Sequence, residues 1–282
     1  MIPPITVVES TNDCNLKCIV CARNYMTRKV GYIDLKLAEK IMAQIPVGRF
    51  FWAHGWGEPL LHPQFCEFVR IAKKRRLLIG AITNATLLDK EYGKGIIDSG
   101  LDWLVFSVDT DDEGVYEKIR VGANYHQVIE NINNFLGLKR KLASRKPYTQ
   151  INILDLPLTT NRISSLVNMW RGRVDRIRVK KTNEYGELCP QIHALTNRQL
   201  LPRSTVCSAL RKGGIIIYWD GRVGPCCTDF DGRIIYGDLN EQSLSSVWNS
   251  QTRLELKNKQ ERGEFPDMCK FCHTDEQPFT DV

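Results

Sequence analysis

The sequence predicts an α/β protein built as a partial (β/α)6 TIM-like barrel, followed by a small module made of a β-hairpin plus a helix. Three observations lead to this prediction. Apolar, β-branched segments alternate six times with amphipathic helical segments, the pattern of parallel strands joined by right-handed crossovers. Six such units favour an incomplete barrel over a flat doubly wound sheet. The alternation stops after about residue 186, so we expect one domain over residues 1–186 and a second over residues 187–282.

Each predicted strand is a short run rich in apolar and β-branched side chains. These runs cover residues 5–10, 50–54, 78–83, 103–108, 149–154 and 176–180. Each predicted helix has apolar residues spaced three and four apart, the period of an amphipathic helix. These helices cover residues 35–44, 63–75, 90–99, 126–142 and 162–170. In the tail we expect an apolar strand over 214–219, a turn at Asp220-Gly221, a strand over 233–236 and a helix over 244–259.

Composition narrows the class of protein. With 43% hydrophobic and 25% charged residues the chain is globular, which excludes disorder, collagen and a disulfide mini-protein. Its 39 basic and 32 acidic residues give a net charge of +7, but the basic clusters are not interleaved with stacking aromatics, which argues against a nucleic-acid partner. No apolar run is long enough for a membrane span and the start lacks a signal peptide, so we expect a cytoplasmic protein. Ten cysteines in that reducing compartment indicate metal binding or catalysis.

The first group of cysteines lies directly after the first predicted strand. Cys14, Cys18 and Cys21 form a C-x3-C-x2-C array at the C-terminal end of that strand, where (β/α) barrels place their chemistry. Three thiolates are one fewer than an iron–sulfur cluster or a structural zinc ion takes from protein. A four-iron cluster held in this way has one iron open to an external chelator. The alternative is a zinc site completed by His54 or His62.

The array resembles that of the radical S-adenosylmethionine (SAM) superfamily, over roughly residues 5–185. The resemblance implies that the three cysteines bind a [4Fe–4S] cluster. It also implies that SAM chelates the open iron and that its reductive cleavage gives a 5′-deoxyadenosyl radical, which abstracts hydrogen from a substrate. The sequence departs from the family at Val20, where an aromatic residue is usual before the third cysteine. This departure affects an adenine contact and no ligand bond.

The segments after the second, third and fourth strands resemble the SAM-binding segments of the same family. Glycine permits close backbone approach, a carboxylate suits the SAM ammonium, and a planar guanidinium suits the SAM carboxylate. The resemblance assigns SAM binding to Gly55, Gly57, Glu58, Thr83, Asn84, Ser107, Asp109 and Arg120. The alternatives are turn or cap roles for the strand-end residues, and for Arg120, which ends a helical segment, a surface pair with Glu117.

A second group of cysteines lies in the tail. Thirteen residues separate Cys207 from Gly221, four more lead to Cys226, and Cys269-x2-Cys272 follows near the end. The spacing resembles that of the SPASM and twitch modules, and the lack of cysteines after Cys272 favours a twitch-like module. The resemblance implies a second, auxiliary [4Fe–4S] cluster held by Cys207, Cys226, Cys269 and Cys272.

Other assignments of the tail cysteines stay open. Four cysteines also suit a zinc ribbon. Cys227 is an alternative to Cys226, because adjacent strand residues point in opposite directions. We expect Cys66 and Cys189 to be buried or free thiols.

The sixth predicted strand offers candidate catalytic residues. Strand alternation directs Arg178 and Lys180 toward the barrel interior, where a cation can position a polar substrate or take its proton; the alternative is a salt bridge to a barrel carboxylate. The motifs are most similar to those of the radical SAM dehydrogenases that oxidise 2-deoxy-scyllo-inosamine. The resemblance implies oxidation of an alcohol in a sugar, cyclitol or similar small metabolite, with an electron donor such as flavodoxin or ferredoxin.

Two other functions are compatible with the cysteine pattern. The first is cross-linking or epimerisation of a ribosomally made peptide, against which the absence of a leader-binding domain before residue 5 argues. The second is a zinc or iron–sulfur interaction protein, which would have no need of Glu58, Asp109 and Arg120.

Overall fold

A computed structural model describes residues 5–183, 185–196, 199, 201–273 and 279–282. Within them one sheet runs in the order β10-β6-β5-β4-β3-β2-β1-β7-β8-β9. Its six parallel strands are β1 (Ile5–Val8), β2 (Phe50–Trp52), β3 (Leu78–Thr83), β4 (Trp103–Ser107), β5 (Tyr148–Asp155) and β6 (Arg176–Lys181). These strands fall on the six predicted runs, and the prediction of an α/β partial barrel is confirmed.

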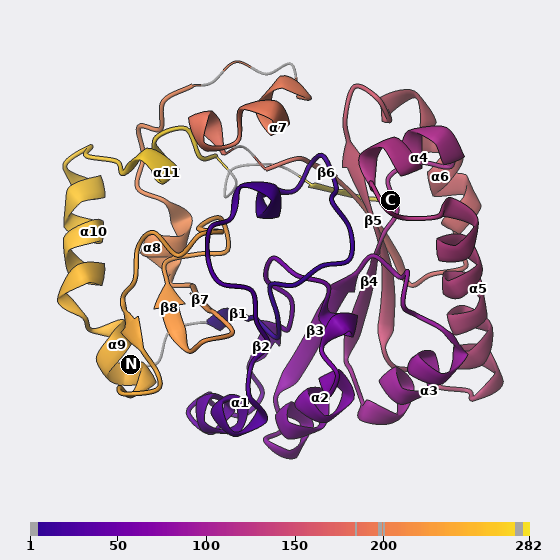
Figure 1. Ribbon diagram of the computed structural model, residues 1–282, viewed down its shortest axis with the longest axis horizontal. Coiled ribbons are helices and arrows are strands. Elements are labelled where there is room, and N and C mark those ends of the chain that lie inside the picture. Colours follow the sequence, from indigo (N-terminus) through magenta and orange to yellow (C-terminus); the bar gives the residue numbers. More distant parts are fainter. Residues whose placement is uncertain (1–4, 184, 197–198, 200, 274–278) are drawn as a thin grey trace.

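Helices cover the outer face of the parallel strands (Figure 1). They are α1 (Leu35–Met42), α2 (Phe65–Lys74), α3 (Lys90–Ser99), α4 (Glu113–Ile119), α5 (Tyr125–Lys141) and α6 (Ile163–Trp170). Short 3-10 helices η1 (Ala22–Tyr25), η2 (Pro59–Leu61), η3 (Thr160–Arg162) and η4 (Gly186–Leu188) lie in the connections. No helix in the described ranges is both long and apolar enough to span a bilayer.

The tail adds strands to both ends of this sheet. At one end β7 (Ile215–Ile217) pairs in parallel with β1, and β8 (Arg222–Gly224) and β9 (Gly237–Asp238) follow antiparallel. At the other end β10 (Phe279–Asp281) pairs antiparallel with β6. The remaining elements of the tail are α7 (Pro190–Ala194), α8 (Ser208–Lys212), α9 (Leu244–Trp248), α10 (Gln251–Glu261) and α11 (Asp267–Lys270). The boundary between residues 186 and 187 stays a prediction.

Two tail elements differ from the prediction. The single helix expected over 244–259 is broken, because Ser250 has extended backbone and its side chain accepts a hydrogen bond from the Arg253 N–H, starting α10 anew. The segment 233–236 is not a strand, because the backbone N–H groups of Arg233 and Ile234 donate to the Asp229 carboxylate at 2.9 Å each.

A layer of aromatic side chains fills the barrel interior at the N-terminal ends of the strands. The ring centroids of Phe50 and Trp52 are 4.9 Å apart, and those of Trp103 and Tyr148 are 4.7 Å apart, both edge to face. Trp52 and Trp103 join the two pairs at 6.2 Å. Because Phe50, Trp103 and Tyr148 are the first residues of β2, β4 and β5, the space left inside the barrel opens toward the C-terminal ends of the strands.

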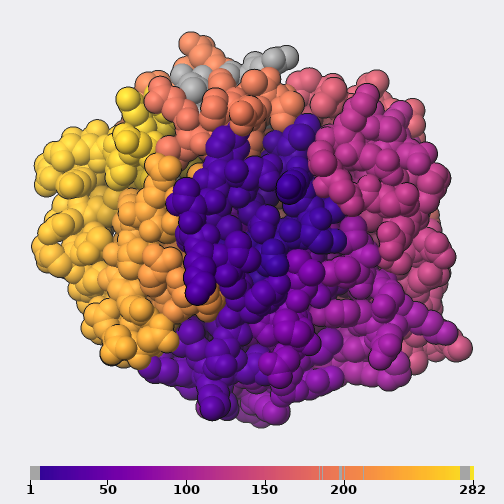
Figure 2. All heavy atoms as spheres, viewed as in Figure 1, coloured from indigo at the N-terminus to yellow at the C-terminus, as the bar shows by residue number. Residues whose placement is uncertain are grey.

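A buried ion pair joins the barrel to the tail. Arg28 donates to both carboxylate oxygens of Glu9 at 2.9 Å and to the carbonyl of Phe230 at 2.8 Å, while its guanidinium lies 4.5 Å from the Tyr218 ring centroid. Both charged side chains are almost fully buried, at 2% and 0% exposure. The N-terminal loop therefore lies between the tail and the barrel, as the space-filling view shows (Figure 2).

Candidate active site

A cavity of about 410 Å³ lies at the C-terminal ends of the strands. Of the predicted SAM-binding and metal-binding residues of the barrel, all line it: Cys14, Cys18, Cys21, Gly55, Gly57, Glu58, Thr83, Asn84, Ser107, Asp109 and Arg120. They come from loops more than 100 residues apart in sequence, which the parallel strands bring to one edge.

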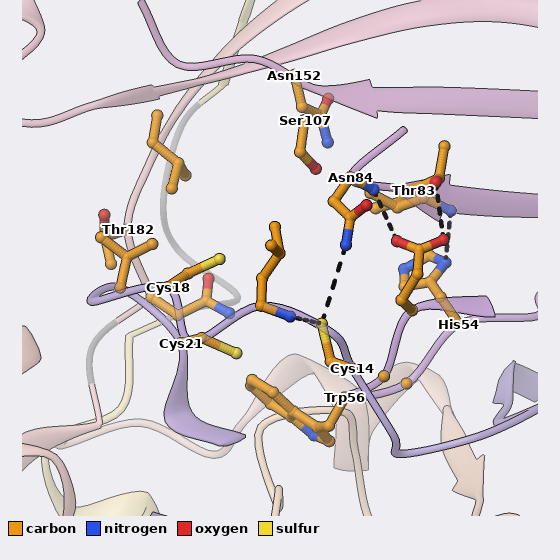
Figure 3. Close-up of a pocket in the computed structure, with 18 of the residues that line it drawn as sticks. Cys14, Cys18, Cys21, His54, Trp56, Thr83, Asn84, Ser107, Asn152 and Thr182 are labelled. Atoms are coloured by element: carbon orange, nitrogen blue, oxygen red, sulfur yellow. Dashed lines mark hydrogen bonds between the residues drawn. The ribbon is translucent and has the colours of Figure 1, made fainter. Parts of the chain in front are cut away.

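The three cysteines of the N-terminal loop point their sulfurs into the same open space (Figure 3). Cys14 Sγ accepts from the backbone N–H of Leu16 at 3.4 Å and lies 4.0 Å from Asn84 Nδ2. Burial raises the pKa of Cys14 to about 12 and that of Cys21 to about 11. These thiols therefore ionise only when a compensating cation such as iron binds the thiolates. This donor set fits a cluster that takes three thiolates from the protein.

The geometry disfavours a single zinc ion here. Among the described residues, no three His, Cys, Asp or Glu side chains gather closely enough to hold one metal ion. A four-iron cluster binds each thiolate at a different iron, so its ligands are further apart. His62 has both ring nitrogens engaged, by the Ile33 carbonyl at 2.9 Å and the Gln64 N–H at 3.1 Å.

Glu58 joins the ends of β2 and β3. Its carboxylate accepts hydrogen bonds from the Thr83 hydroxyl at 2.7 Å and from the backbone N–H groups of Asn84 and Leu60 at 2.7 and 3.1 Å. Burial raises the pKa of Glu58 to about 7 even though these bonds lower it. The carboxylate therefore holds the loop that lines the cavity as well as facing it.

Gly57 is required by the protein's own backbone, and Gly55 is required by the buried side chain of Glu9. A Cβ on Gly57 would lie 2.5 Å from the carbonyl oxygens of Thr11 and Asp13, and a Cβ on Gly55 would lie 2.3 Å from a carboxylate oxygen of Glu9. The second-strand loop thus packs directly on the cysteine loop, and the Glu58 N–H donates to the Asp13 carbonyl at 2.7 Å.

Arg120 is held by a buried carboxylate beside the first cysteine group. Its Nε donates to Asp109 at 2.7 Å, and Asp109 also accepts from the Leu154 N–H at 3.1 Å. The alternative pairing with Glu117 is wrong, because Glu117 instead accepts from the backbone N–H of Tyr125. Arg120 Nη1 lies 3.9 Å from Cys18 Sγ, so the guanidinium is positioned next to the expected cluster.

The structure separates the two candidate catalytic cations of β6. Lys180 lines the cavity, and burial lowers its pKa. Arg178 does not line it, and donates to Asp281 of β10 at 3.0 Å. Arg178 therefore forms a salt bridge, but its carboxylate partner belongs to the tail strand β10 and not to the barrel, as the sequence-based alternative had it.

Sequence reasoning missed Asn152 as a residue of the cavity, and it considered His54 only as an alternative zinc ligand. His54 Nδ1 accepts from the Ile82 N–H at 3.2 Å, and burial lowers the pKa of His54 to about 3. The ring is therefore neutral and carries its proton on Nε2. Both residues follow the inward alternation of their strands, a signal that would have found them.

In the tail, Cys226 and Cys227 have different surroundings, and only Cys227 lines the main cavity. Burial raises the pKa of Cys226, and the neighbouring thiols of Cys227, Cys272, Cys269 and Cys207 raise it further, which places it among the tail cysteines. Cys227 lines the main cavity; burial raises its pKa, the neighbouring thiol of Cys272 raises it further, and Lys180 lowers it. Through Cys227 the tail therefore reaches the cavity that the first group lines. Cys66 and Cys189 are free thiols outside both groups.

Comparisons with known proteins agree with this arrangement. Residues 8–145 match the model of the radical SAM superfamily, and residues 207–273 match SPASM, an iron–sulfur cluster-binding domain. These two domains imply a SAM-binding [4Fe–4S] cluster and an auxiliary [4Fe–4S] cluster. The chain is 24% identical over 286 residues to the tungsten-containing aldehyde ferredoxin oxidoreductase cofactor-modifying protein of Pyrococcus furiosus, covering 86% of this chain and 80% of that protein.

Two solved structures have a similar fold. One is BtrN in complex with AdoMet and 2-DOIA, with a TM-score of 0.66 and 19% identity over 97% of this chain and 94% of that one. The other is Streptococcus suis SuiB bound to the precursor peptide SuiA, with a TM-score of 0.68 and 16% identity over 89% of this chain and 65% of that one. At these identities the likeness is one of fold.

Proposed function

This chain carries a radical SAM domain and an SPASM domain, and we propose that it oxidises an alcohol of a sugar, cyclitol or similar small metabolite. The observation that supports this reaction is that one cavity is lined by Cys14, Cys18 and Cys21 and also by Cys227, the sequence neighbour of Cys226. A substrate bound in it would lie between a source of radical and an acceptor of an electron.

When bound, the first cluster supplies the electron that cleaves SAM, and the tail cluster accepts the electron that the substrate radical gives up. In our proposal Arg120, fixed by Asp109 beside Cys18, binds the SAM carboxylate. The substrate C–H hydrogen atom goes to 5′-deoxyadenosine, and the hydroxyl proton goes to Lys180. Burial lowers the pKa of Lys180, which favours the neutral amine that can accept it.

The test uses anaerobically reconstituted protein, a one-electron reductant such as flavodoxin, and a panel of cyclitols and amino sugars deuterated at their carbinol carbons. We expect deuterium in 5′-deoxyadenosine and a product two hydrogens poorer than its substrate. The variant lacking Cys14, Cys18 and Cys21 should form neither, whereas the variant lacking Cys269 and Cys272 should form 5′-deoxyadenosine but no oxidised product. Oxidised product from the second variant would overturn the role of the tail cluster.

A peptide substrate is the second candidate, and the fold shared with peptide-bound SuiB supports it. Modification of a peptide would transfer deuterium from a labelled peptide to 5′-deoxyadenosine, with no turnover of the small alcohols. The two candidates are therefore separated by which labelled compound loses its deuterium.

A further inference from the structure

Three buried hydrogen-bond donors near the tail cysteines have no partner among the described residues. They are the hydroxyl of Tyr236, the amide Nε2 of Gln260 and the guanidinium Nε of Arg253. Tyr236 is 4% exposed and Gln260 is 2% exposed, so water does not reach these side chains freely. Buried donors in folded proteins are almost always paired, and several that lack partners around one space indicate a group that accepts their hydrogen bonds.

Two of these donors, Gln260 and Tyr236, are held close to the tail cysteines or to the strand that leads to them. Gln260 Oε1 accepts the backbone N–H of Cys207 at 3.0 Å, which sets the Gln260 amide beside that cysteine. Gln260 lies on α10, which Figure 1 shows next to α8 and α11. Helix α8 follows Cys207, and α11 contains Cys269. The Tyr236 N–H donates to Val223 at 2.8 Å, fixing the tyrosine against the strand that leads to Cys226.

The electrostatic surroundings agree with this placement. Burial raises the pKa of the Tyr236 phenol, and the thiols of Cys226, Cys269 and Cys207 raise it further, while Arg253 lowers it. The guanidinium of Arg253 lies 3.5 Å from the centroid of the Trp248 ring, which holds it in place. Tyr236 therefore lies near the tail cysteines, and Arg253 lies near Tyr236.

We propose that Tyr236, Gln260 and Arg253 donate hydrogen bonds to the sulfurs of the tail cluster and raise its reduction potential. Sulfides and thiolates of a cluster accept hydrogen bonds, and reduction adds negative charge to them, so donors stabilise the reduced form more than the oxidised form. This inference deepens the proposed function and rests on it, since a higher potential makes the tail cluster a better acceptor for the electron of a substrate radical.

The test measures the potential without any substrate. In a parent variant lacking Cys14, Cys18 and Cys21, only the tail cluster contributes to the electron paramagnetic resonance signal during a redox titration. Adding Tyr236→Phe should leave the iron content unchanged and lower the midpoint so that the ratio of reduced to oxidised cluster at a given potential falls about tenfold, which is 59 mV for a one-electron couple. Tyr148→Phe, the same change at an exposed tyrosine at the closed end of the barrel, should leave the midpoint where it is.

A second measurement guards against a small shift in structure. After exchange into deuterated buffer, pulsed electron–nuclear double resonance of the reduced cluster should detect a coupled deuteron from the Tyr236 hydroxyl in the parent. This signal should be lost in Tyr236→Phe. An unchanged midpoint at unchanged iron content would overturn the inference while the loss of product in the Cys269 and Cys272 variant still supported the proposed function. A tail site that holds zinc and no iron would overturn both.

Discussion

Replacing Arg28 with methionine should destabilise the protein strongly, because it leaves the carboxylate of Glu9 buried without its cation. Glu9 would keep only the backbone N–H groups of Trp56 at 3.2 Å and Trp219 at 3.3 Å. Removing one partner of a buried pair costs about 3–5 kcal/mol, far more than the pair itself contributes relative to an apolar replacement. At about 2–4 °C per kcal/mol, the melting temperature should fall by roughly 10 °C.

The assay is thermal unfolding followed by circular dichroism, under anaerobic conditions and without SAM. The double variant Glu9→Gln with Arg28→Met should recover more than half of the loss, because a neutral amide is far cheaper to bury than a carboxylate. Arg262→Met is the matched control, since Arg262 pairs with Glu264 at the surface, and it should melt with the wild type. Melting of Arg28→Met within about 2 °C of the wild type would refute the reasoning.

Three further predictions concern the cavity. Gly57→Ala would place a methyl group 2.5 Å from backbone oxygens of the cysteine loop, so SAM cleavage should fall roughly 100-fold. Formation of 5′-deoxyadenosine by this variant at the wild-type rate would contradict this prediction. Burial raises the pKa of Glu58 from its ordinary 4.5 to about 7, so the folded protein holds a proton that the unfolded chain releases between these values. Stability should therefore decline as the pH rises from about 4.5 to 7, and Glu58→Gln should flatten this decline; melting curves with the same pH dependence in both proteins would argue against it. Lys180→Met should lower the yield of product per SAM cleaved about 100-fold. Arg178→Met should spare the yield, because Arg178 does not line the cavity and Asp281 keeps its pair with Arg176; the opposite ranking would reverse their roles.

Local patterns account for the barrel and fail in parts of the tail. The six parallel strands have their own apolar runs and separate crossover helices, so periodicity alone finds them. The strand β10 is only three residues long and pairs with β6 about 100 residues earlier, and nothing in its own sequence marks that pairing. The break before α10 depends on a cap at Ser250, which competes with an otherwise continuous helical pattern.

The candidate site divides along the same line. Motif position alone leads to the three cysteines and to the strand-end residues that line the cavity. What the motif does not reveal is which polar groups are already engaged: the carboxylates of Glu58 and Asp109 hold neighbouring backbone as well as facing the cavity. Equally, the different environments of Cys226 and Cys227 arise from tertiary packing, since adjacent cysteines are equivalent in sequence.

The tail strands β7 and β10 cover the two outer strands of the parallel sheet, β1 and β6. Without residues 187–282, β1 and β6 would present unpaired backbone N–H and C=O groups along the two edges of the sheet, which are templates for pairing with another chain. With the tail in place, the outermost strands of the described sheet are β9, with two residues, and β10, with three, too short to recruit a neighbour. A barrel cut after the predicted boundary at residue 186 is therefore expected to aggregate through these two edges.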